Sequence, residues 1–454
     1  MCQESASASS LLDLPNELLL AIAGRLDDDS LLHLAASCKR MNLLLIPGIF
    51  ARCDYKLPHA FFGALPAQHF NGESLVVLPA IGIASFIHSI DEIDCAFFAY
   101  NRYVLPKEIF GAATALNTLA IRLKHLGHLK FNPYVAGYST HELFGWSNAV
   151  AAFLNSAAER GDCAITVYSG FRDDYVADPR PFSHVFRAQG SVARSQSRVT
   201  IGQRLKRALA SLLRFSRRNN DGRRSSQGAD APVFISTPGI ESTERPSGVK
   251  IPFVGKSGLT TLSIESSFLF HANFYRWTLH TINTSPLTSL TLSNIDLSHY
   301  DWTLTLPALT IPALTHLTIG PGQCAITVPD LDAFLARHPT IWALDLSFHP
   351  AIGALTPPTT VQMLPRLASL FATPDYLLYF LSGEEAGAWY PALRAVGVTS
   401  NDESVYQVAQ FARVVDVVGA RNVVPCVSVS GRLANHCEVP AHLSFSVWIS
   451  QGSA

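Results

Sequence analysis

His125 and His128 are the side chains whose spacing in this sequence comes nearest to a metal site. Two imidazoles a few residues apart can bind one ion when both stand on the same face of a helix. The run Lys124-His125-Leu126-Gly127-His128, however, contains a glycine that breaks a helix. We therefore interpret the pair as two separate surface histidines, and we expect no metal ligand and no cofactor.

The short motifs that carry catalytic chemistry are missing from this sequence. It has no Gly-x-Ser-x-Gly nucleophile turn, no glycine-rich phosphate loop and no His-Glu-x-x-His helix. Its eight cysteines are scattered without a Cys-x-x-Cys pair, which predicts reduced, mostly buried thiols. We expect no catalytic residue and no enzyme activity; an unrecognised active site in residues 50–185 is the alternative.

The composition is typical of a folded protein. Of the 454 residues, 48% are hydrophobic and 15% charged, and 34 Lys and Arg nearly balance 35 Asp and Glu. This excludes a disordered chain and a polycationic nucleic-acid binder. The apolar stretch 75–87 contains Pro79 and Gly82 and is shorter than the roughly 20 residues that a bilayer requires. With acidic residues where a signal peptide would need basic and apolar ones, we expect a cytoplasmic or nuclear location, or both, without a membrane span.

Two short helices are predicted within the first fifty residues. Residues 14–26 read LPNELLLAIAGRL, in which Leu18, Ile22 and Leu26 recur every four positions. The acidic run 27–30 then supplies turn and N-cap side chains for a second helix. Apolar residues on the other faces exceed what about 40 residues can bury alone, so this unit needs a partner. Periodicity leaves open whether the partner is another protein or the next domain.

The residue identities of this stretch resemble the F-box motif over about residues 11–50. The resemblance rests on Leu14-Pro15-x-Glu17-Leu18-x3-Ile22-x3-Leu26, an acidic turn, and Leu31-x2-Leu34-x3-Cys38-Lys39-Arg40. It implies a helical trio that binds the Skp-type adaptor of cullin-based ubiquitin ligases. The adaptor-binding positions that it implies are Leu14, Pro15, Leu18, Ile22, Leu26, Leu31, Leu34 and Cys38. Ala35-Ala36 and Met41 replace larger side chains that are more frequent in the family, which would weaken the contact.

A repeat of the pattern Leu-x-x-Leu-x-Leu runs through the second half of the chain. Its first positions are 28, 27, 27, 26 and 26 residues apart, at Leu259, Leu287, Leu314, Ile341, Leu367 and Leu393. Prolines stand two residues ahead of the last four of these positions, where each would end the preceding helix. Helical patterns lie between the strands, so the sequence predicts one strand and one helix per repeat.

This arrangement resembles the leucine-rich repeat, which implies an α/β horseshoe solenoid with parallel strands on its concave side. The family's asparagine three positions after the third apolar residue is met only by Asn401. Upstream, the run Leu116-x2-Leu119-x-Ile121 fits the strand pattern, Ile165 and Val167 predict a strand, and residues 140–160 predict a helix closed by Gly161. We therefore expect degenerate repeats from about residue 70 onward.

Residues 187–224 form a basic segment with 11 Lys and Arg and one acid, Asp221. Its composition predicts disorder, and Ile201, Leu205 and Leu209 could share one face of a basic helix. Nuclear import, contact with anionic lipid or an acidic partner, and a solvated loop without a role all remain open. We expect no sequence-specific nucleic-acid binding, because no nucleic-acid module surrounds the segment.

A binding surface follows from the strand geometry, since the residues between the inward apolar positions must face outward. Most of these are small and polar. The large or charged exceptions, which we take as candidate target-binding residues, are Glu265, His316, Asp345 and Phe371.

These expectations combine into one reading of the chain. The predicted parts are an F-box helical domain at 11–50, a connector at 51–69, degenerate repeats at 70–186, a basic insertion at 187–250 and a repeat array at 251–450. The resemblance implies a substrate adaptor of a Skp–cullin–F-box ubiquitin ligase, with a Skp-type adaptor, a cullin and a protein target as partners. The alternative is a repeat scaffold that delivers no substrate for ubiquitination.

Overall fold

The computed structural model describes much of the chain outside residues 169–256. The described residues are 11–55, 63–97, 106–133, 140–168, 257–270, 274–320, 324–347, 364–382, 390–399, 406–419, 426–430 and 445–448. The chain divides into one unit formed by 1–177 and 251–454 and a second unit, 178–250. The second unit contains the predicted basic segment and lies outside the described residues, so the description below concerns the first.

The first fifty residues form a short 3-10 helix and three α-helices. They are η1 (Leu11–Asp13), α1 (Asn16–Ala23), α2 (Asp28–Ser37) and α3 (Lys39–Arg52). The predicted first helix is therefore shorter than residues 14–26, because Pro15 is its N-cap and the chain leaves the helix at Gly24. The predicted cap of the second helix is confirmed, since the Asp27 side chain accepts a hydrogen bond from the Ser30 N–H at 2.7 Å.

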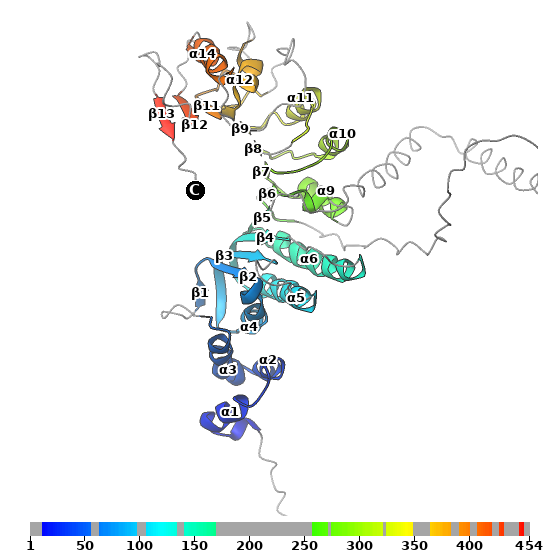
Figure 1. Cartoon of the computed structure of the whole chain (residues 1–454), viewed down its shortest axis with the longest axis vertical. Helices are drawn as coiled ribbons and strands as arrows, with labels where there is room; N and C mark the ends of the chain where they lie inside the picture. The colour runs from blue at the N-terminus through cyan, green and yellow to red at the C-terminus, as the bar shows by residue number, and fades with distance from the viewer. Residues whose placement is uncertain are drawn as a thin grey trace, which may run out of the picture. The chain divides into compact units, whose positions relative to one another are not determined.

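The rest of the unit is one open sheet of 13 parallel strands, shown in Figure 1. In chain order the strands are β1 (Gly63–Leu65), β2 (Gln68–Asn71), β3 (Ile87–Ala96), β4 (His125–Asn132), β5 (Ala164–Tyr168), β6 (Thr261–Glu265), β7 (Ser289–Leu292), β8 (His316–Ile319), β9 (Ala343–Leu346), β10 (Ser369–Ala372), β11 (Ala395–Thr399), β12 (Cys426–Ser430) and β13 (Phe445–Trp448). From β3 onward each strand pairs with the next one in the sequence, and β1 and β2 both pair with β3. The sheet thus begins at Gly63, inside the segment 51–69 that the sequence suggested as a connector.

Helices lie between most successive strands of the described residues, as is typical of a parallel sheet. They are η2 (Gly72–Val77), α4 (Leu78–Ile83), α5 (Pro106–Arg122), α6 (Thr140–Arg160), η4 (Ser267–Phe270), α9 (Tyr275–Thr284), α10 (His299–Ala308), α11 (Val328–Arg337), α12 (Pro374–Leu381) and α14 (Tyr406–Gly419). Figure 1 shows α6, α9, α10 and α11 on the same side of the strands. The α/β solenoid-like repeat predicted from the sequence is therefore present. Among the described residues, none of the helices is long and apolar enough to cross a bilayer.

The strands of the predicted repeat pair in the register that the pattern requires. Leu262, Leu290, Leu317, Leu344 and Leu370 stand opposite one another from strand to strand, and all are buried. Equivalent apolar side chains therefore stack into one continuous core between the sheet and the helices. The other face, which we call the open face, carries the intervening residues.

A proline turn closes four of the repeats just before the strand. The amides of Leu314, Ile341, Leu367 and Leu393 each donate to the carbonyl three residues earlier, at 3.1, 3.2, 3.1 and 3.2 Å. The repeating proline stands second in each of these turns, where its fixed φ is already suitable. The prolines thus form β-turns between helix and strand, which is more specific than the helix-ending role that the sequence suggested.

The prediction of a strand at Leu116-x2-Leu119-x-Ile121 is wrong. These residues lie in helix α5, and the strand of that repeat is β4, at His125–Asn132. Leu116 and Leu119 are buried while Ile121 is 69% exposed, as helical periodicity requires. A spacing of three fits one turn of a helix as well as the repeat pattern, and here alanine-rich surroundings favour the helix. The predicted helix at 140–160 is confirmed as α6, and Gly161 follows it with a φ of +76°.

Candidate protein-interaction surfaces

A row of exposed apolar side chains lies on the helices of residues 11–52. Leu18 is 51% exposed and Ile22, one turn further along α1, is 41% exposed. Leu11, Leu12, Leu20 and Leu43 are exposed as well. Leu18 and Ile22 share one face of α1, and exposed apolar side chains that lie together are typical of a protein-interaction surface.

The eight residues carried over from the F-box resemblance differ in accessibility. Pro15, Leu18 and Ile22 are exposed, and Leu14, Leu26, Leu34 and Cys38 are partly exposed. Leu31 is 2% exposed, so its side chain belongs to the core beneath the surface. The Cys38 thiol caps helix α3 by accepting from the Met41 N–H at 3.5 Å. Leu20 and Leu43 belong to the apolar residues that the sequence places on other faces of these helices, and they are 46% and 44% exposed.

Two arginines hold this helical region together. The Arg40 guanidinium donates to the carbonyls of Leu12 and Leu14 and to the Asn16 side chain. The Arg52 guanidinium donates to the carbonyl of Ala23 at 3.0 Å and to that of Leu26 at 3.1 Å. Both arginines therefore bind backbone carbonyl oxygens of the short helix α1 and its flanking turns, which fixes this helix in place.

Asn42 joins this helical region to the first repeat. Its side chain is buried, and its amide nitrogen donates to the carbonyls of Ala35 at 3.2 Å and Ile83 at 2.8 Å. Its amide oxygen accepts from the backbone N–H of Ser85 at 2.8 Å and from the Ser85 hydroxyl at 2.9 Å. The four hydrogen bonds satisfy the whole amide group and connect helices α2 and α3 to the end of α4.

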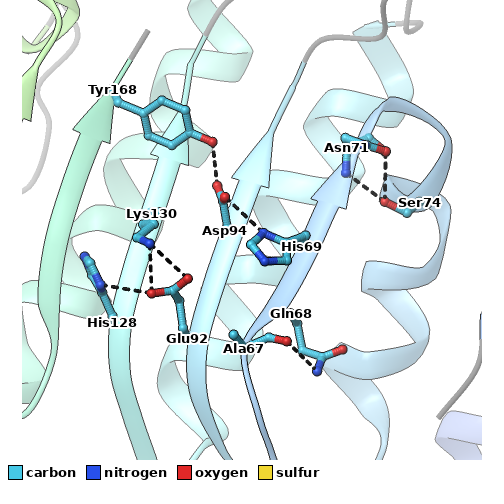
Figure 2. Close-up of polar contacts among 10 residues, drawn as sticks. All are labelled: Ala67, Gln68, His69, Asn71, Ser74, Glu92, Asp94, His128, Lys130 and Tyr168. Carbon is cyan, nitrogen blue, oxygen red and sulfur yellow. Dashed lines mark hydrogen bonds and ion pairs between the residues drawn. The ribbon is translucent and has the colours of Figure 1, made fainter. Parts of the chain in front are cut away.

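The open face of strands β2 to β5 carries a network of charged side chains, drawn in Figure 2. The Glu92 carboxylate pairs with the Lys130 ammonium at 3.0 Å and with the His128 imidazole at 3.2 Å. Burial opposes the ionisation of Glu92, but Lys130 and His128 more than offset it and lower the pKa of Glu92. The His128 ring also contacts the Thr166 hydroxyl at 2.9 Å.

A second branch of the network centres on Asp94 (Figure 2). The Tyr168 hydroxyl donates to one carboxylate oxygen at 2.5 Å, and the His69 ring lies 3.1 Å from the other. Burial and the Asp94 carboxylate both raise the pKa of Tyr168, which keeps the phenol protonated. The network therefore presents fixed hydrogen-bonding groups and no activated nucleophile.

The structure keeps His125 and His128 apart, as the sequence suggested. The His125 ring pairs with Asp162 at 3.4 Å and His128 pairs with Glu92. Within the described ranges, no group of three or more histidine, cysteine or acidic side chains is arranged to hold a metal ion. The cysteines described there are free, and burial raises the pKa of the Cys163 and Cys324 thiols to about 12.

The four residues predicted to bind a target all lie on the open face of the later strands. Glu265 ends β6, His316 begins β8, Asp345 lies in β9 and Phe371 lies opposite Asp345 in β10. The sequence missed Trp342, which is 48% exposed and has its ring centroid 5.1 Å from that of His316. The repeat pattern could have identified Trp342 as exposed, because it occupies the position held by Thr260, Thr288 and Thr315 in the preceding repeats.

Comparison with known proteins supports the assignment of the helical region. The family model of the F-box-like domain matches residues 11–49. The match covers η1, α1, α2 and most of α3, and it includes the exposed row on α1. None of the curated proteins matches the chain. Residues 11–49 of this chain are therefore an F-box-like domain.

Proposed function

We propose that this protein is the target-recognition subunit of a Skp–cullin–F-box ubiquitin ligase. The observation that carries the proposal is the F-box-like domain at residues 11–49, which supports a role in binding the Skp-type adaptor of such ligases. The cullin and the ubiquitin-charged enzyme would join through the adaptor. Such a complex would operate in the cytoplasm, the nucleus or both.

The adaptor would cover the exposed apolar row of the F-box-like domain. Leu18 and Ile22 would form its centre, because both are exposed on one face of α1 and are fixed through Arg40 and Arg52. Full burial of a leucine or isoleucine side chain contributes about 1.5–3 kcal/mol. Leu31 would act indirectly, since its buried side chain can only shape the surface from below.

The chain itself would catalyse no step of the transfer. Its contribution would be to hold a target protein beside the ubiquitin-charged enzyme, which raises the effective concentration of target lysines. The hydrogen bonds of Asn42 support this role, because they join the adaptor-binding helices to the sheet that would hold the target. We propose the open face of the sheet as the target-binding surface.

The double substitution Leu18→Asp/Ile22→Asp tests the adaptor interface. Two carboxylates at the centre of an apolar contact should abolish copurification of the Skp-type adaptor and cullin from a eukaryotic lysate. Circular dichroism should stay unchanged, because both side chains are exposed. The matched control is Ile121→Asp on α5, an even more exposed apolar residue far from the F-box-like domain in the sequence, and it should bind normally.

The result separates the target receptor from its alternatives. Retained adaptor binding by the double variant would refute the assignment of the α1 surface. Loss of adaptor binding together with slower turnover of copurifying proteins in cells would support the receptor. Adaptor binding without any change in turnover would instead support a scaffold that delivers no substrate.

A further inference from the structure

The strands carry an uneven distribution of charge. In the described strands there are five acidic residues, Asp91, Glu92, Asp94, Glu265 and Asp345, and a single basic residue other than histidine, Lys130. Lys130 is already paired with Glu92. The sheet therefore keeps negative charge that the described strands do not neutralise.

Two of these carboxylates have no cationic partner in the part of the chain that the structure describes. The Glu265 carboxylate accepts from the Ser263 hydroxyl at 2.9 Å, and the Asp345 carboxylate accepts from the Ser347 hydroxyl. Among the described residues no lysine, arginine or histidine, including Arg394 before β11, lies within ion-pair distance of either carboxylate. Burial raises the pKa of Asp345, because it disfavours the charged carboxylate. A cation that pairs with this carboxylate would offset that unfavourable burial of charge.

Exposed aromatic side chains lie on both sides of β9, the strand that carries Asp345. Trp342 precedes it by three residues and packs against His316, which places the indole toward β8. Phe371 is 36% exposed and lies opposite Asp345 in the next strand. A side-chain carbon built on Gly397 would come within 1.9 Å of the Phe371 ring, so this ring lies toward β11, on the side away from Asp345. Tryptophan and phenylalanine faces attract the charged ends and the methylene stems of lysine and arginine.

The spacing of the two carboxylates fits an extended peptide. Glu265 and Asp345 lie on β6 and β9, which are three strand positions apart in the sheet. Neighbouring strands are about 4.8 Å apart, so the lateral separation is about 14 Å. Glu265 also lies two residues beyond the level of Asp345, because Ser263 is the β6 residue in register with it. An extended chain covers the resulting distance of about 16 Å in four to five residues.

We propose that the open face from β6 to β11 binds an extended basic segment of a target protein. Two lysine or arginine side chains about four to five residues apart pair with Glu265 and Asp345. Aromatic or aliphatic neighbours of the second basic residue pack on Trp342, whose ring lies toward β8, and on Phe371, whose ring lies toward β11. The same charges disfavour nucleic acid and phosphorylated peptides, because phosphate groups would face carboxylates without intervening cations. The inference deepens the proposed function, on which it rests for the identity of the ligand as a ubiquitination target.

A random peptide display library, panned on the full-length chain, tests this specificity. We expect the selected peptides to be enriched in lysine and arginine, with paired basic residues and an apolar neighbour. A fluorescent copy of the most enriched peptide should bind more weakly as salt concentration rises. Its affinity should fall at least tenfold for Glu265→Gln/Asp345→Asn and at least threefold for Trp342→Ala.

Two variants away from the open face serve as matched controls. Glu159→Gln removes an exposed carboxylate from α6, and Phe110→Ala removes an exposed ring from α5. Both should bind the peptide as the wild type does. Enrichment of acidic or uncharged peptides, no enrichment at all, or full binding by the Glu265→Gln/Asp345→Asn variant would each overturn the proposal. The chain could also select no peptide but bind a second copy of itself, and Glu265→Gln/Asp345→Asn could abolish this self-association. That result would identify the second copy as the ligand of the open face and would overturn the proposal as well.

The adaptor experiment separates this inference from the proposed function. Glu265→Gln/Asp345→Asn should still bind the Skp-type adaptor, because both positions lie outside the F-box-like domain. Basic-peptide selection by a chain that binds no adaptor would retain the surface and reject the ligase. Adaptor binding without basic-peptide selection would support the ligase and reject the basic-peptide surface.

Discussion

His338 shows how one buried side chain connects two repeats. Its Nδ1–H donates to the Phe334 carbonyl at 2.7 Å, and its Nε2 accepts from the Ile311 N–H at 3.1 Å. This arrangement requires the neutral ring, because a proton on Nε2 would point at another N–H group. Burial, together with the neighbouring Arg337 guanidinium, lowers the pKa of His338.

The stability of the repeat array should therefore depend on pH through His338. An unfolded histidine has a pKa of about 6.5 and the folded one is lower, so below pH 6.5 the unfolded chain binds more protons. Stability should fall as the pH drops from about 6.5 toward the folded pKa. His338→Gln can keep both hydrogen bonds without titrating, so its melting temperature should fall less between about pH 7.5 and 5.5. Equal losses in both proteins would contradict the neutral tautomer.

Sequence patterns predicted residues whose role depends on local geometry and missed those whose partners are distant. The Asp27 cap could be predicted because its partner, Ser30, is three residues away. Arg40 and Asn42 lie within the stretch that resembles the F-box motif, but apart from Ala35, seven residues from Asn42, their partners are 24 to 43 residues away in the sequence. No periodicity encodes such contacts. A buried asparagine among apolar helix residues is at most a hint of one.

At the scale of elements, the repeat length was easier to predict than the element type. The register of the strands from β6 to β11 follows from the spacing of Leu262, Leu290 and their equivalents, since each repeat needs the same inward side chains. The sequence assigned Leu116-x2-Leu119-x-Ile121 to a strand, but the structure places it in α5. Three apolar residues are too few to separate a helical period from a repeat pattern, and the long α5–α6 pair marks the first repeats as different from the later ones.

Asn42→Ala tests the connection between the F-box-like domain and the sheet. The substitution leaves the buried Ala35 carbonyl without its partner, at a cost of about 1–3 kcal/mol, and removes the partly buried bonds to the Ile83 carbonyl and the Ser85 N–H, whose loss costs less. Hydrogen exchange at the Ser85 amide and along α3 should become faster, while exchange in β7 to β9 should not change. Adaptor binding should persist, because the Asn42 side chain is buried and contributes nothing to the exposed apolar surface of α1.

Asn283→Ala is the matched control for this experiment. The Asn283 side chain makes an analogous bridge in the later repeats, donating to the Ala308 carbonyl at 2.7 Å and accepting from the Thr310 N–H at 2.8 Å. Its loss should speed exchange near α10 and leave Ser85 protected. If both variants loosened the same amides, the F-box-like domain and the repeats would respond as one unit and Asn42 would have no special role.

At the scale of the whole described unit, the two halves of the sequence form one sheet. Strand β5 pairs directly with β6, although residues 169–256 separate them in the chain. Gly258 lies so close to Gly161 that a side-chain carbon on Gly258 would come within 2.5 Å of the Gly161 Cα. The Trp277 indole donates to the Asn155 side chain at 2.6 Å, which joins α9 to α6. The join is therefore made by residues on either side of the long connection.

Deleting residues 190–228 should consequently leave the stability of the protein nearly unchanged. The deletion shortens the connection 169–256 from 88 residues to 49, which alters the closure entropy by only about 0.5 kcal/mol. We expect the free energy of unfolding to stay within about 1 kcal/mol, measured by denaturant titration. Gly258→Ala is the destabilising counterpart, because its methyl group meets the Gly161 backbone, which cannot move aside as a flexible side chain would. If the deletion cost as much as Gly258→Ala, the segment would have to contribute packing to the sheet, and the prediction of a disordered basic insertion at 187–250 would be wrong.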